Sequence, residues 1–209
     1  MNSQTLLLDE ALSYAARSVL DVTPALLPCA TPCRGWNLDM LLRHTNDSLA
    51  ALHEGIVTGH VGLVPEAPER DLAGSVARII WEQAHQLLSA RATTDRRQIL
   101  DVGDLPLPAM ALECAGAIEM AVHGWDISQA CGQRRPIPDT LASNLLTIAP
   151  LLISETGRHP LFSPPVTATA HTSPGNRLVA FLGRNPPASL RPPDHPSPIQ
   201  SRGGFATRG

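Results

Sequence analysis

The chain has 209 residues, of which 43% are hydrophobic and only 3% aromatic, and its formal net charge is −3 at pH 7 with histidine neutral. This length suits one domain with a small addition, and the apolar content is enough for a packed core. All 16 basic residues are arginine, which excludes chemistry that needs a lysine, such as a Schiff base. No basic patch favours nucleic-acid binding, and no apolar run reaches the roughly 18 residues that a membrane span needs.

The N-terminal residues lack the basic start of a signal peptide, and Asp9 and Glu10 directly follow a short apolar run. We therefore expect a cytoplasmic protein without a membrane partner. In that compartment cysteines are normally reduced, so we expect free thiols rather than a disulfide framework. The four cysteines are Cys29, Cys33, Cys114 and Cys131.

Apolar residues at three- and four-residue spacing predict an amphipathic helix over residues 3–20. A second helix is expected to begin after Asn37, which is a good N-cap, and to end near Gly55 or Gly59. The same patterns predict further helices and the loops between them: loop 60–70, helix 72–91, loop 101–108, helix 109–131 and helix 138–154.

The C-terminal part has a different composition. Residues 166–170 predict a short strand and residues 175–182 a short helix, whereas residues 184–209 are rich in proline and predict a disordered tail. We therefore expect an all-α up-down four-helix bundle over residues 1–155, a small strand and helix appendage over 156–183, and the tail.

Glu119 and His123 are four residues apart, so on a helix they share one face. Helical arithmetic places that face on the buried side of the bundle, where a bare carboxylate costs several kcal/mol. A bound metal ion would offset this cost, and the alternative is a half-buried ion pair.

His44 lies at the margin of the apolar stripe of the second helix. Two imidazoles and one carboxylate with an open fourth position are typical of catalytic zinc, while a single histidine there is more often a packing residue.

Two segments resemble the signatures of one known family. Residues 31–44 read TPCRGWNLDMLLRH and are similar to TPC-x-GW-x-x-x-x-LL-x-H, and residues 119–126 read EMAVHGWD and are similar to E-x-x-x-H-x-W-D. Both patterns belong to the mycothiol-dependent maleylpyruvate isomerase N-terminal family, within the DinB-like superfamily of metal-binding four-helix bundles. Shorter likenesses at 162–166 and 182–184 are typical of an actinobacterial subgroup described only as metal-binding.

The resemblance implies that His44, Glu119 and His123 are the metal ligands. Zinc is the first expectation, with nickel, iron, cobalt or manganese as alternatives, because the ligand types do not fix the metal. In the family, the open metal position binds a low-molecular-weight thiol, mycothiol, and activates it toward a small electrophilic substrate. The isomerase carries a sizeable α/β C-terminal domain where this chain has the short region 156–183, so the groups that bind thiol and substrate do not carry over.

Asp126 follows His123 by three residues on the same helix face and is our candidate catalytic residue. Either it accepts a hydrogen bond from a ligand imidazole and orients it, or it makes an ordinary surface or interhelical contact. Trp125 is expected in the core, and Trp36 is expected to pack on Leu41 as a hydrophobic staple.

Cys33 belongs to the first signature and is expected to be structural. The remaining histidines are expected to pack or to lie at the surface: His53, His60, His85, His159, His171 and His195.

Three functions fit these residues. The first is a metal- and thiol-dependent transferase or isomerase, and the second is a metalloenzyme of specialised metabolism that uses no thiol. The third is a non-catalytic metal-binding module for stress or partner binding. The sequence leaves open which substrate is used and whether the protein forms a homodimer.

Overall fold

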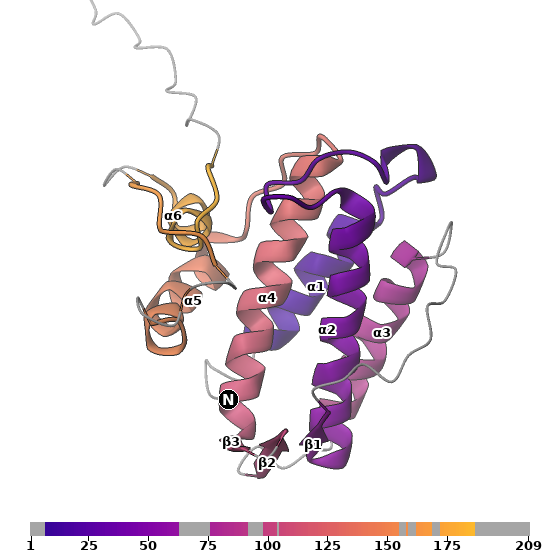
Figure 1. Cartoon of the computed structure of the whole chain (residues 1–209), viewed down its shortest axis with the longest axis vertical. Helices are drawn as coiled ribbons and strands as arrows, with labels where there is room; N and C mark the ends of the chain where they lie inside the picture. The colour runs from indigo at the N-terminus through magenta and orange to yellow at the C-terminus, as the bar shows by residue number, and fades with distance from the viewer. Residues whose placement is uncertain are drawn as a thin grey trace, which may run out of the picture.

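A computed structural model of the chain describes residues 7–62, 76–91, 98–103, 105–154, 158, 162–168 and 172–186. This part of the protein is mostly helical, with a small three-stranded sheet (Figure 1). The helices are α1 (Leu7–Val19), a 3-10 turn (Pro24–Leu26), α2 (Leu38–Thr58), α3 (Val76–Arg91), α4 (Ala109–Ala130), α5 (Asp139–Leu152) and α6 (Pro174–Phe181). None of these helices is both long enough and apolar enough to span a bilayer.

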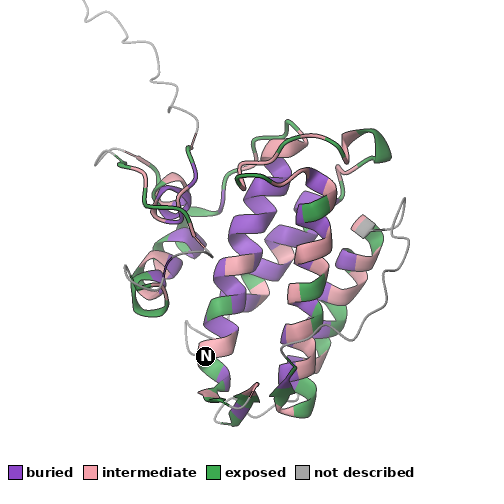
Figure 2. Ribbon diagram, in the orientation of Figure 1, coloured by how far each residue is buried: buried purple, intermediate pink, exposed green. Residues whose placement is uncertain are grey.

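Helices α1 to α4 pack side by side. Helix α1 contacts α4 and α3, and α2 contacts α3 and α4, so their apolar faces meet in one buried core (Figure 2). Helix α1 packs tightly on α4 at Gly124, where an added Cβ would lie 3.0 Å from the Ala15 Cα. This closeness fixes the upper half of α4, which carries Glu119 and His123, against the core.

Both predicted ends of α2 are confirmed. The Asn37 side chain accepts a hydrogen bond from the Met40 backbone N–H at 2.9 Å, which satisfies one of the free donors of the first turn. At the other end Gly59 has a φ of 78°, and its N–H bonds to the Gly55 carbonyl. A left-handed residue in this place is a usual helix end, and glycine adopts it without strain.

The sheet corrects the prediction of loops at residues 60–61, 101–102 and 105–108, whereas residues 63–70 and 104 lie outside the described residues. Strand β1 (His60–Val61) pairs in parallel with β2 (Ile99–Val102), which pairs antiparallel with β3 (Leu105–Pro108). The tight reversal between β2 and β3 includes Gly103 at a φ of 58°. The sheet closes the lower end of the helices, away from the metal-ligand candidates (Figure 1).

Helices α5 and α6 form the C-terminal part. Helix α6 packs mainly on α5, and α5 in turn contacts α4 and α1. The helix predicted for 175–182 is therefore confirmed. The strand predicted for 166–170 is wrong over 166–168, which the structure shows as coil with one backbone bond, from the Val166 N–H to the Ala180 carbonyl. Residues 169 and 170, and the tail beyond 186, lie outside the described residues.

Candidate metal centre

Two helices bring the predicted ligands together. His44 lies on the second turn of α2, and Glu119 and His123 lie one turn apart on α4. The Glu119 Oε2 is 2.8 Å from the His123 Nε2 and 3.7 Å from the His44 Nε2. One donor atom from each of the three side chains lies within 4.8 Å of the others. The i, i+4 spacing therefore places two donors on one face of α4, and the packing of α2 supplies the third.

The donor set fits a divalent transition metal. Zinc binds imidazole nitrogen and carboxylate oxygen at about 2.1 Å, so two ligands of a tetrahedral ion lie about 3.4 Å apart. The two measured separations, 2.8 and 3.7 Å, bracket this value. The His123 side chain is 6% exposed, whereas those of His44 and Glu119 are 37% and 34% exposed. The prediction that both α4 residues face the buried side therefore holds for His123 only, and the centre opens to solvent on the other side.

Asp126 is hydrogen-bonded to Nδ1 of His123, the ring nitrogen that faces away from Glu119. Its Oδ2 lies 3.2 Å from the His123 Nδ1, and the carboxylate itself has no exposed surface. When Nδ1–H donates to Asp126, the Nε2 lone pair faces Glu119 and the space between the helices. This arrangement of carboxylate and imidazole is common behind metal ligands, where it fixes the tautomer and the ring orientation.

Arg184 is a residue of this centre that the sequence reasoning placed in the disordered tail. Its side chain is 7% exposed, and its Nη2 donates to the Asp126 Oδ2 at 2.9 Å. Its Nη1 donates to the Leu182 carbonyl at 2.9 Å, which ties the guanidinium to the end of α6. The tail prediction is therefore wrong for Arg184. The sequence signal was weak, because this arginine is followed at once by the proline-rich stretch.

Trp36 belongs to the centre, not only to the start of α2. Its ring centroid lies 4.9 Å from that of His44 and 6.5 Å from that of His123. The expectation that it serves as a staple apart from the site is therefore corrected: the indole forms an apolar wall beside both ligands. The sequence places Trp36 one residue before the cap of α2, and the bend there turns the ring over the second turn, which carries His44.

Cys33 lies in the same loop. Its backbone N–H bonds to the Thr31 Oγ1 at 3.2 Å, and its carbonyl accepts from the Trp36 N–H at 3.1 Å, so the loop is held locally. Burial raises the pKa of the Cys33 thiol, and the nearby Arg184 partly counters this. The thiol is therefore protonated near neutral pH. All four cysteines are free, as expected.

The charges of the centre support one another. Burial alone would raise the pKa of Glu119, but hydrogen bonds to His123 and His44 hold it well below its ordinary value. Burial alone would lower the pKa of His123, but hydrogen bonds to Asp126 and Glu119 raise it to about 9. Without metal, the protonated His123 supplies the positive charge next to Glu119 and Asp126. Binding of a metal ion would displace this proton.

The other candidates lie away from the centre. Trp125 is buried in the core, as predicted, at 3% exposure. His85 is exposed and stacks on Trp81 at 3.9 Å, His60 is exposed, and His53 faces the space between α2 and α3. The remaining three, His159, His171 and His195, lie outside the described residues.

Comparisons with known proteins add no relative: no family model, curated protein or solved structure matches the chain. The function proposed below therefore depends on the geometry of the candidate centre and on the two sequence signatures.

Proposed function

We propose that the chain is a divalent-metal-dependent enzyme, with zinc as the first candidate, that uses a low-molecular-weight thiol to transfer or isomerise a small electrophilic substrate. The observation that carries the proposal is the convergence of His44, Glu119 and His123 from two helices, with Asp126 behind one of the imidazoles. An exposed ion pair would need neither the convergence nor the buried carboxylate behind it.

The exposure of the centre favours catalysis over a structural role. Structural zinc sites are closed by four protein ligands, whereas catalytic sites keep one position for water or substrate. Within the described residues the cluster offers three protein donors, and two of the three side chains are about one third exposed. A bound ion would therefore keep a coordination position for an exogenous ligand, which can reach it from solvent.

Each residue around the centre has a distinct task in this proposal. Asp126 accepts from His123 Nδ1 and holds the ring so that Nε2 faces the ion, and Arg184 balances the charge of Asp126. Trp36 provides an apolar wall that keeps water from one side of the ligands. A divalent ion in this donor set would lower the pKa of a bound thiol or water and so supply a nucleophile at neutral pH.

We assign α1 to α4 to a DinB-like four-helix bundle. The mutual packing of these four helices and the position of the ligands on facing helices support this assignment. The two signatures of the mycothiol-dependent isomerase family lie on the elements that build the centre. The proposal that this chain uses a thiol depends on the resemblance to that family alone.

A metalloenzyme without a thiol is the second candidate. The described residues after α5 form one short helix and coil, and none of them is assigned to binding a thiol. In this candidate, water or the substrate itself takes the open position.

Metal content tests the centre directly. We expect the purified protein to hold about one equivalent of divalent metal, as a three-residue site implies, and a His44→Ala/His123→Ala variant to hold none. A His85→Ala variant is the matched control, because it removes an exposed histidine outside the cluster. The metal is measured by elemental analysis after dialysis, and circular dichroism verifies folding. Equal metal content in the folded double variant would overturn the assignment.

A thermal shift with mycothiol separates the two enzyme candidates. A ligand stabilises only the state that it binds, so thiol use predicts a rise in melting temperature in the metal-loaded protein and none in the metal-free protein. Cysteine serves as a second thiol that lacks the sugar portions. A shift without metal, or no shift with metal at saturating mycothiol, would contradict thiol dependence and favour the second candidate.

A further inference from the structure

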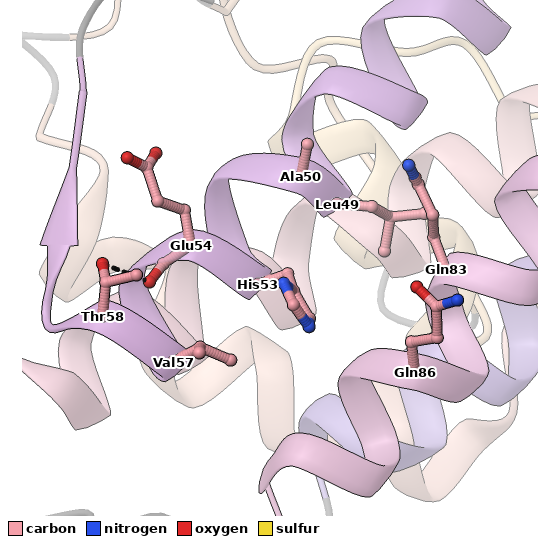
Figure 3. A pocket seen from close by; sticks show the side chains of 8 residues that line it. All are labelled: Leu49, Ala50, His53, Glu54, Val57, Thr58, Gln83 and Gln86. Carbon is pink, nitrogen blue, oxygen red and sulfur yellow. Dashed lines mark hydrogen bonds between the residues drawn. The ribbon is translucent and has the colours of Figure 1, made fainter. Parts of the chain in front are cut away.

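Helix α3 borders a hollow on its α2 side and another on its α1 side, and neither belongs to the metal centre between α2 and α4. In the hollow toward α2 the polar groups do not converge, because the Glu54 carboxylate is directed away from Gln83, on the β1 side of α2 (Figure 3). The hollow toward α1 differs, because a cationic side chain and an aromatic pair line it together. Its lining residues are Leu12, Ser13, Ala16, Arg17, Trp81, Ala84, His85 and Leu88.

Helices α1 and α3 run antiparallel, which determines the residues that meet across this hollow. Arg91, the last residue of α3, pairs with Asp9 in the first turn of α1. Counted from that pair, Arg17 lies eight residues along α1 and Trp81 lies ten residues back along α3, which is about 12 Å and about 15 Å at the rise of an α-helix. Arg17 and Trp81 therefore lie at nearly the same level on the two helices.

Trp81 gives the hollow an aromatic surface. Its side chain is large and apolar, yet the residue is 40% exposed. The ring centroid of His85 lies 3.9 Å from that of Trp81, and the His85 Nδ1 donates to the Trp81 carbonyl at 2.8 Å, which orients the imidazole. A planar ring placed on the exposed part of the indole would gain an aromatic contact and would remove apolar area from water.

Arg17 gives the hollow its charge. It is the only lining residue with a formal charge at pH 7 when histidine is neutral, and no carboxylate lines the hollow. The Arg17 Nε donates to the Ser13 carbonyl at 3.1 Å, so the side chain turns back along α1 toward Ser13, which also lines the hollow. Within the part of the chain that the structure describes, its two Nη groups have no hydrogen-bond partner. A guanidinium in this state matches the two oxygens of a carboxylate.

The carboxylates of the two helices lie outside the hollow. Asp9 pairs with Arg91, and Glu82 pairs with Arg78 at 2.6 Å. Glu10 is exposed in the first turn of α1, about two turns before Arg17. An anion in the hollow therefore reaches Arg17 without a protein carboxylate beside it, whereas a cation there meets repulsion.

We propose that the hollow between α1 and α3 binds a small aromatic carboxylate. The carboxylate accepts from the Nη groups of Arg17, and the ring lies on the exposed part of Trp81. The volume of the hollow, about 290 Å³, is at the lower end of small-molecule sites, so it suits one ring with a short acidic chain. This site is separate from the proposed metal chemistry and stands whether or not the metal centre is catalytic.

The probe is phenylacetate, with phenylacetamide as an uncharged counterpart of nearly the same shape. The indole N–H signals of the three tryptophans report binding in NMR titrations of the full chain, and a Trp81→Phe variant identifies the signal of Trp81. We expect phenylacetate to shift that signal saturably and phenylacetamide to bind several-fold more weakly. Equal binding of the amide, or saturable shifts confined to Trp36 beside the metal centre, would overturn the proposal. So would the absence of a saturable shift at Trp81.

Matched variants test the charge. Arg17→Gln is expected to weaken phenylacetate binding about two- to fivefold, the range of an exposed charge pair, and to leave phenylacetamide binding unchanged. Arg177→Gln is the control, because it removes the same charge from an exposed position on α6, outside the hollow. If Arg177→Gln weakens binding as much as Arg17→Gln, the attraction is not local and the proposal fails.

A third ligand tests the ring. Cyclohexylacetate keeps the charge and the apolar bulk of phenylacetate but has no aromatic face. It is expected to bind about two- to tenfold more weakly, the range of an aromatic pair contact. Binding of cyclohexylacetate as tight as that of phenylacetate would show that Trp81 recognises no aromatic ring and would also overturn the proposal.

Discussion

The two ring nitrogens of His123 face two different carboxylates. Nε2 lies 2.8 Å from Glu119 one turn before it, and Nδ1 lies 3.2 Å from Asp126 three residues after it. Only the second of these carboxylates is wholly buried, and Arg184 compensates its charge at 2.9 Å. Glu119, which is 34% exposed, could therefore take part in holding a metal ion, while the buried Asp126 orients the His123 ring.

Replacing Asp126 with asparagine tests this division. Asp126→Asn keeps the shape of the side chain but removes the charge that orients His123, so we expect metal affinity to fall by about 10- to 100-fold, the usual effect of losing a partner behind a ligand. Competition with a chromophoric chelator measures the change. Asp139→Asn, at an exposed position in the first turn of α5, is the control. An affinity equal to that of the unaltered protein would show that Asp126 only packs.

At this scale, spacing along one helix predicted the residues of α4 that lie together, and the family resemblance added His44 from α2. Arg184 and Trp36 were not predicted to join them. The spacing of Glu119, His123 and Asp126 on one helix fixes their mutual placement from the sequence alone. Arg184 reaches Asp126 across 58 positions, and only the docking of α6 brings it there. Trp36 was likewise assigned to its own helix start because no local rule indicates that its ring turns toward His44.

At the scale of elements, a buried cluster joins three helices. Arg91, the last residue of α3, has a side chain that is only 2% exposed and pairs with Glu113 on α4 at 3.2 Å and with Asp9 on α1. Burial raises the pKa of Glu113, and the Arg91 guanidinium partly counters that effect. The Arg91 guanidinium thus pairs with carboxylates from two other helices at the point where α1, α3 and α4 meet.

Arg91→Ala is expected to destabilise the protein by about 3–5 kcal/mol, because it removes the cation beside the buried Glu113 carboxylate. Urea unfolding followed by circular dichroism measures the loss. Arg78→Ala is the matched control, since its pair with Glu82 is exposed and is expected to contribute less than about 1 kcal/mol. A loss for Arg91→Ala no larger than that of the control would show that the cluster is solvated.

The helices were predictable from their apolar periodicity, and the hairpin was not. The prolines at 106 and 108 argue against a strand, since proline cannot donate to a ladder. The structure resolves this conflict because β3 is at the edge of the sheet, paired only with β2, where missing donors are tolerated. Gly103 before Asp104 is a turn signal of the kind found in tight hairpins.

At the scale of the whole molecule, the C-terminal segment is part of the folded protein up to Arg184. A chain cut after residue 186 is expected to keep the stability and metal affinity of the whole chain. A chain cut after residue 183 is expected to lose about 3 kcal/mol, because Asp126 stays buried without its cation. Urea unfolding and chelator competition measure both effects.

Arg184→Ala in the full chain is the companion to these truncations. It removes the cation and leaves the backbone in place, so it is expected to reproduce the loss seen for the shorter chain. If the chain cut after residue 186 is already destabilised, the residues beyond it contribute to the fold. If neither the shorter cut nor the point variant has an effect, the contact of Arg184 with Asp126 carries no stability.

The long separation between Asp126 and Arg184 also sets an order of events during synthesis. Helices α1 to α4 leave the ribosome first, and the 58 positions that separate the two residues take roughly 3–12 s to translate at about 5–20 residues per second. Until then Arg184 does not lie beside the carboxylate behind His123. A newly made chain therefore has all three candidate metal ligands several seconds before it has the arginine that pairs with Asp126, so early metal capture and final metal affinity would be separate properties of this candidate centre.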